Sequence, residues 1–327
     1  MNTFGETVLP DFLLPAHDLC FLNHNILVEL LRSGEESGIF SQKFEFINSA
    51  DKEAFEQTQD VFSWFEITSR SSERSELLKR IVFPALLSDF LHFIYEALEN
   101  SRKGKLSVAY SLIRKPIQEN LFLFEAIAAD TEQFAGYLID NPLKLRAGKA
   151  GGLDAHAKRI AFVLNAIAEE DRFDAEYLAQ IRYAKIEDGF DGICNHAIHL
   201  FTEHPEIRTE PLNINFIFSG REQHITQWYY LYSRLPYLLF YARRLVEYLC
   251  STFSRTAPEY LANIERRVIA GTLLWAPNVE NTYRHEKIDK FVEATRNRLD
   301  KECENANCGP VKKEDLALML KTGKLPE

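Results

Sequence analysis

The stretch KLSVAYSLIRKPIQENLFLFEAIAA, residues 105–129, decides the fold class. Its apolar residues recur every three or four positions and cover one side of a helical wheel, which is typical of a helix packed on its neighbours. Pro116 lies in the middle, removes one intrahelical hydrogen bond and predicts a kink near Leu112. The polar side chains share one narrow sector of the wheel: Ser107, Ser111, Arg114, Gln118 and Glu125.

Two polar residues of this helix fall outside that sector, because Glu119 and Asn120 project among apolar positions. A buried amide or carboxylate without a partner costs about 1–3 kcal/mol, so we expect each to be paired. With Arg114, they form the predicted set of buried polar residues. Our interpretation is that these groups and the proline kinks fix helix register, and a polar pocket at the kinks is the alternative.

The same apolar spacing continues along most of the chain. Further prolines, Pro84 and Pro236, lie inside helical patterns, and one segment, LNINFIFS at 212–219, alternates with a period of two. We therefore predict an all-α bundle of long, partly proline-kinked helices with one short strand or hairpin near 212–219. The other helices are expected at 17–32, 51–67, 73–100, 131–139, 154–170, 174–185, 188–203, 222–253, 258–275, 281–303 and 314–321.

The segment RAGKAGG at 146–152 is the best internal boundary. It predicts an N-terminal helical region at 1–150 and a C-terminal one at 151–327, with one continuous domain as the alternative. Its glycines and lysine, followed by a helix start, could hold a phosphate. It lacks the Gly-Lys-Ser/Thr spacing of a P-loop, so we interpret it as a linker.

Composition limits the function classes. The 327 residues carry a formal net charge of −10, which argues against a main role in gripping nucleic-acid backbone, although a local basic patch stays open. No cationic region precedes an apolar run, and no apolar run reaches the ~18 residues that span a bilayer. Five scattered cysteines suit reduced thiols. We expect a soluble, cytoplasmic protein without a membrane partner.

The predicted helix at 188–203 holds the strongest candidate for chemistry. Asp188, Asp191 and His199 share one face at spacings of three and four, with His196 at its edge. Such a face could hold a divalent ion on Asp188 and His199, or supply catalytic His196, His199 and Asp191. The alternative is an ordinary solvated helix face. No cofactor is indicated.

The stretch AYSLIRKPIQENLFLFEAIAAD, residues 109–130, resembles a recurring helix of uncharacterised bacterial all-helical proteins that are similar to HEPN-type bundles. The resemblance marks Arg114 and Glu119. It implies a group that includes ribonuclease toxins, phage-defence components and non-catalytic nucleotide-binding or interaction modules. Catalytic members are expected to carry Arg, four to six residues, then His, and Arg221-x-x-His224 is too short for that pattern.

We therefore expect a non-enzymatic interaction or regulatory module that self-associates as a homo-oligomer, with a link to stress or phage defence implied by the resemblance alone. The alternative is a hydrolase that acts on a nucleotide or RNA through the Asp/His helix at 188–203. The sequence leaves open whether the protein is an enzyme, and it identifies no small-molecule ligand.

Overall fold

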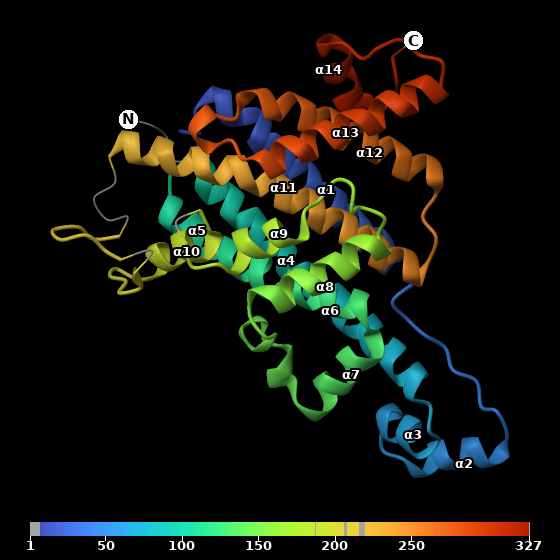
Figure 1. Ribbon diagram of the computed structural model, residues 1–327. Coiled ribbons are helices and arrows are strands. Elements are labelled where there is room, and N and C mark those ends of the chain that lie inside the picture. The colour runs from blue at the N-terminus through green and yellow to red at the C-terminus, as the bar shows by residue number, and fades with distance from the viewer. Residues whose placement is uncertain (1–6, 187, 206–207, 216–219, 327) are drawn as a thin grey trace.

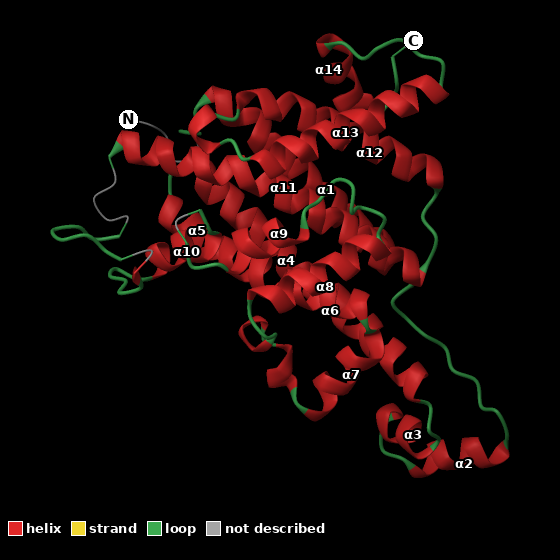
Figure 2. Cartoon of the chain, viewed as in Figure 1, coloured by secondary structure: helices red, strands yellow, loops and turns green. Residues whose placement is uncertain are grey.

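The computed structural model describes residues 7–186, 188–205, 208–215 and 220–326. Every regular element in these ranges is helical, which confirms the predicted all-α class (Figure 2). Short 3-10 turns join some of the helices. The α-helices are α1 (Leu14–Glu36), α2 (Ser49–Gln57), α3 (Val61–Ile67), α4 (Ser71–Arg102), α5 (Leu106–Lys115), α6 (Leu121–Ala129), α7 (Thr131–Asp140), α8 (Leu153–Ala166), α9 (Ala175–Tyr183), α10 (Phe190–Ile198), α11 (Arg221–Phe253), α12 (Pro258–Trp275), α13 (Glu286–Asn305) and α14 (Lys313–Thr322).

Helix α11 is the centre of the bundle (Figure 1). Leu231, Leu238 and Leu245 are fully buried, and so are Tyr237 and Tyr241 on other sides of the helix. A helix that is buried around most of its circumference must have neighbours on several sides. These neighbours include α1, α5 and α6. The main core joins side chains from Leu9 to Phe291, and a smaller cluster joins α12 to α13 and α14.

Helix α4 is long and apolar enough to meet the length and composition criterion for a membrane span, alone among the helices described. Its side chains Phe83, Leu87 and Ile94 are fully buried in the main core. Core helices of soluble proteins meet the same criterion, so this property is weak evidence for a membrane location.

The helix expected at 51–67 is two helices, α2 and α3. Asp60 is the reason, because its side chain accepts hydrogen bonds from the backbone N–H groups of Phe62 and Ser63 at 2.8 and 3.0 Å. An aspartate in this N-cap position starts a new helix. The apolar spacing continued through the break, so the prediction of one helix was wrong here.

The strand expected at 212–219 is not found in its described part. Residues 212–215 lie in turns and loop, and residues 216–219 lie outside the described ranges. Leu212 is fully exposed with a φ of 65°. The Asn215 amide donates to the carbonyl oxygen of His199 at 2.7 Å, so its side chain serves a loop instead of a ladder. The prediction of a strand or hairpin was therefore wrong for residues 212–215.

The proposed boundary at 146–152 contains a 3-10 turn, Ala147–Lys149, and two glycines, Gly151 and Gly152, with φ of 97° and 85°. These positive angles let the chain turn directly into α8. Side chains from both sides of this segment belong to the main core. The division into two regions stays an interpretation.

Candidate functional site

A π-helical turn, Pro116–Asn120, lies between α5 and α6 where the sequence predicts a proline kink. The N–H of Leu121 bonds to the carbonyl oxygen of Pro116, five residues back. Such turns occur frequently at functional sites. Here two carbonyl groups of the turn accept hydrogen bonds from α9: Arg182 Nε lies 2.7 Å from the oxygen of Ile117, and the Tyr183 hydroxyl lies 3.2 Å from that of Gln118.

A buried ion pair between Glu125 and Arg182 fixes α6 against α9. Both side chains are completely buried. The Glu125 carboxylate also faces Arg159 at 3.0 Å and accepts a hydrogen bond from the Tyr241 hydroxyl at 3.0 Å. Burial opposes ionisation of Glu125, but the charges of Arg182 and Arg159 outweigh it and lower its pKa. Two guanidinium groups thus face one carboxylate, which leaves a surplus positive charge.

His156 completes this cluster in its neutral form. Burial, assisted by the charges of Arg159 and Arg182, lowers its pKa to about 4. Its ring stacks on Tyr183 with 3.7 Å between ring centroids, and Arg159 Nη2 lies 2.6 Å from His156 Nδ1. A neutral imidazole can accept this hydrogen bond without repelling the guanidinium group.

The structure joins two features that the sequence presents separately. Asp191 on α10 is buried and accepts a hydrogen bond from Gln118 Nε2 at 2.8 Å. Arg114 lies 3.3 Å from the same carboxylate oxygen and donates from Nε to Gln118 at 3.2 Å. Its side chain is 36% exposed, so the prediction that Arg114 is buried was wrong, although it is paired. The predicted polar sector of residues 105–129 therefore contacts the predicted Asp/His helix. Asn195 adds a donor at 3.2 Å to the other oxygen of Asp191.

The two neighbouring polar residues have different outcomes. Asn120 is buried, as expected, and its amide donates to Asp89 at 2.8 Å and to the carbonyl oxygen of Leu86 at 3.2 Å. Glu119 is exposed, so the prediction that it faces packed neighbours was wrong. The π turn is the physical reason, because its wider winding shifts each following side chain around the helix axis.

The candidate metal and catalytic residues do not converge. Helix α10 ends at Ile198, so His199 is in extended conformation beyond the helix and is exposed. Asp188 lies before the helix and pairs with Arg234 at 3.0 Å. His196 is half-buried on α10. In the described part of the chain, no group of three or more His, Cys, Asp or Glu side chains is placed to hold a metal ion.

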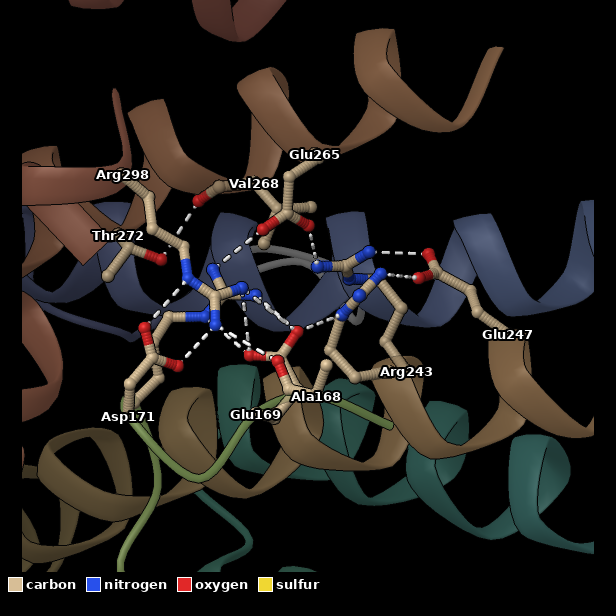
Figure 3. Close-up of polar contacts among 11 residues, drawn as sticks. Ala168, Glu169, Asp171, Arg243, Glu247, Glu265, Val268, Thr272 and Arg298 are labelled. Carbon is tan, nitrogen blue, oxygen red and sulfur yellow. Dashed lines mark hydrogen bonds and ion pairs between the residues drawn. The ribbon is translucent and has the colours of Figure 1, made fainter. Parts of the chain in front are cut away.

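A second buried network, between α11, α12 and the segment after α8, was missed by sequence reasoning (Figure 3). Glu265 lies 2.6 Å from both Arg172 and Arg243. Burial opposes its ionisation, yet the arginines around it strongly lower its pKa. Spacings of three and four residues, as in Glu169-x-x-Arg172, were the available sequence signal. The other charged members are Asp171, Arg244, Glu247 and Arg298.

Helices α2 and α3 form a unit that projects from the end of α4, away from the bundle (Figure 1). It has a small aromatic core of its own, in which Trp64 is buried against Phe44 and Phe55. Arg70 and Asp51, both 7% exposed, pair at 2.6 Å and fix α2 to the start of α4. This unit, which comprises the two helices and their flanking residues from 44 to 70, is called the α2–α3 projection below.

Comparisons with known proteins assign no relative to this arrangement. No protein-family model matches the chain, and neither the curated proteins nor the solved structures contain a significant match. The similarity of residues 109–130 to HEPN-type bundles therefore stays a prediction.

Proposed function

We propose that the protein is a non-enzymatic interaction module that self-associates through the α2–α3 projection. The observation that carries the proposal is the exposure of large apolar side chains on this unit. Ile47 is 78% exposed and Ile67 is 65% exposed, while Phe46 and Phe55 are 44% and 40% exposed. Apolar side chains gathered on a projecting unit are typical of protein interaction sites.

The projection is rigid enough to present these side chains in one arrangement. The Trp64 indole N–H donates to the Asp51 carboxylate at 2.9 Å, and the guanidinium of Arg70 lies 4.5 Å from the Trp64 ring centre. Phe46 and Phe55 pack on each other with ring centroids 5.5 Å apart. Since a preformed surface loses little entropy on binding, it favours association.

The exposed charges of helix α2 are of both signs, which is compatible with a second copy of this chain as the partner, and Lys52 pairs with Glu56 on the same helix at 3.6 Å. Helix α2 carries Lys52 beside the acidic side chains Glu53 and Glu56, and all three are exposed. In a two-fold dimer the same surface contacts itself, so a charge on it is compensated by an opposite charge on the same surface. A purely acidic or basic surface would repel its copy.

The candidate catalytic groups support the non-enzymatic part of the proposal. The Asp191 carboxylate is buried and engaged by Gln118, Arg114 and Asn195, and Asp188 is engaged by Arg234. These contacts are of the kind that fix helices to one another. A cytoplasmic location belongs to the proposal, and a role in stress or phage defence rests on the resemblance of residues 109–130.

Sedimentation velocity over a concentration series tests the proposal. We expect the wild-type protein to form a dimer or higher oligomer and an Ile47→Asp/Ile67→Asp variant to be monomeric, because a buried carboxylate opposes the contact. Leu318→Asp on α14 is the matched control, since Leu318 is 59% exposed on a helix outside the projection. A wild-type protein that stays monomeric, or a control that dissociates equally, would reject the proposal.

A further inference from the structure

A cavity of ≈ 510 Å³ lies between α6, α7 and the start of α8. We propose that it binds a small organic anion, with a phosphate or carboxylate head group and an aromatic or apolar body. Cavities of ~300–1,000 Å³ hold small ligands in other proteins. The proposal is independent of self-association. The lining residues that matter are Phe122, Phe134, Tyr137, Lys144, Lys149 and Arg159.

The charge around the cavity favours an anion. Three cationic residues, Lys144, Lys149 and Arg159, line it, against one carboxylate, Asp130. That carboxylate already accepts a hydrogen bond from the backbone N–H of Gln133 at 2.8 Å and caps α7. The chain as a whole carries a net charge of −10, so the charged side chains that line this cavity are opposite in net sign to the chain.

The buried cluster behind the cavity does not cancel the positive charge of Arg159. Arg159 lines the cavity and also contacts Glu125, the carboxylate that Arg182 faces from the other side. The two guanidinium groups exceed the one carboxylate by one positive charge. Because this uncompensated charge is largely buried, salt screens it less than it screens a surface charge.

The two lysines are the direct partners for an anionic head group. The ammonium nitrogen of Lys144 lies 4.8 Å from the ring centre of Tyr137, and both residues line the cavity. Lys149 also lines the cavity and is exposed. Ala150 and Ala155 bring the start of α8 to the same side. That helix has no side-chain cap, so its first N–H groups are available to an anion, while Asp154 in the same turn opposes their positive field.

The remaining wall suits an apolar or aromatic body. Phe122 and Phe134 are 5% and 2% exposed, and both reach the cavity. The small side chains of Ala126 and Ala129 leave the space open. The apolar part of a ligand would displace water from this largely apolar wall, which favours binding.

Isothermal titration calorimetry tests the site with three probes: AMP, decanoate and inorganic phosphate. We expect at least one of the two organic anions to bind, and Lys144→Glu/Lys149→Glu to weaken that binding by about tenfold or more. Lys158→Glu is the matched control, because Lys158 is an exposed lysine of α8 outside this cavity, and its dissociation constant should stay unchanged.

Binding of AMP alone would identify the ligand class as nucleoside phosphates, and binding of decanoate alone as acyl carboxylates. A second variant, Ala126→Trp, fills the cavity without changing its charge and should abolish binding. The proposal is overturned if neither organic anion binds, if inorganic phosphate binds as tightly as both, or if neither variant weakens binding.

Discussion

Arg182 donates from Nε to the carbonyl oxygen of Ile117 at 2.7 Å, and so α9 pairs with a backbone group of the π turn. The same guanidinium group forms the buried ion pair with Glu125, about two helix turns further along. A proline that disrupts regular winding and a distant arginine thus form one structural unit. The polar residues of this region hold α5, α6, α9 and α10 in register.

Replacement of Arg182 by methionine should lower the free energy of unfolding by about 3–5 kcal/mol, because Glu125 keeps Arg159 alone of its two cationic partners and the carbonyl oxygen of Ile117 loses its buried donor. Urea unfolding followed by circular dichroism measures this change. Arg255→Met is the control, since Arg255 is exposed, and we expect a change within about 0.5 kcal/mol. Equal effects of the two substitutions would show that the buried pair contributes nothing.

His17 should make stability depend on pH. Burial lowers its pKa to about 4, and its Nδ1 shares a hydrogen bond with the Tyr232 hydroxyl at 2.7 Å. The unfolded chain has a histidine pKa of ~6.5, so between these values the unfolded state binds a proton that the folded state does not. The stabilisation is complete above about pH 6.5 and is lost as the pH falls toward 4.

The corresponding experiment is urea unfolding between about pH 5 and 6.5, where histidines titrate and most carboxylates do not. The slope of unfolding free energy against pH should fall by up to ~1.4 kcal/mol per pH unit in His17→Phe, the contribution of one proton. The Tyr232 hydroxyl retains a partner there, Ser101 at 3.0 Å. An unchanged slope would mean that His17 is protonated in the folded protein.

The network around Glu265 should respond to salt unevenly. Arg172 is completely buried, whereas Arg298 at its edge is 31% exposed. Arg172→Met should cost about 3–5 kcal/mol at any salt concentration, and Arg298→Met no more than about 1 kcal/mol, since exposed pairs contribute little and are screened. Unfolding free energies in low and high sodium chloride measure both. A larger effect from Arg298 would contradict this arrangement.

The helices could be predicted because their apolar spacing is regular. Pro258–Trp275 was expected with these same bounds, and residues 105–129 do form one continuous helical stretch. The type of winding could not be predicted, since Pro116 is compatible with either a kink or a π turn. For that reason Glu119 was predicted to face packed neighbours, whereas it is exposed. Asp60, which starts α3, was overlooked because capping breaks a helix without altering apolar periodicity.

The candidate site could be predicted only in part. Asn120 was expected to be buried and paired, and it is. The contact between Gln118 and Asp191 joins positions 73 residues apart, and no local pattern reports such a distance. The assumption that 188–203 is one helix placed His199 on the face of Asp191, but α10 ends at Ile198. The cavity beside α8 depends on tertiary packing, and the segment 146–152, which supplies Lys149 and Ala150 to it, was interpreted as a linker.

The central claim is that Asp191, one of the three catalytic candidates of the sequence, is a structural partner of Gln118. A double-mutant cycle of Gln118→Ala and Asp191→Ala, measured as unfolding free energies, tests it most directly. We predict a coupling energy of about 0.5–3 kcal/mol for contacting residues, and an effect below about 0.5 kcal/mol for His199→Ala. Additive effects of the two substitutions would contradict the account.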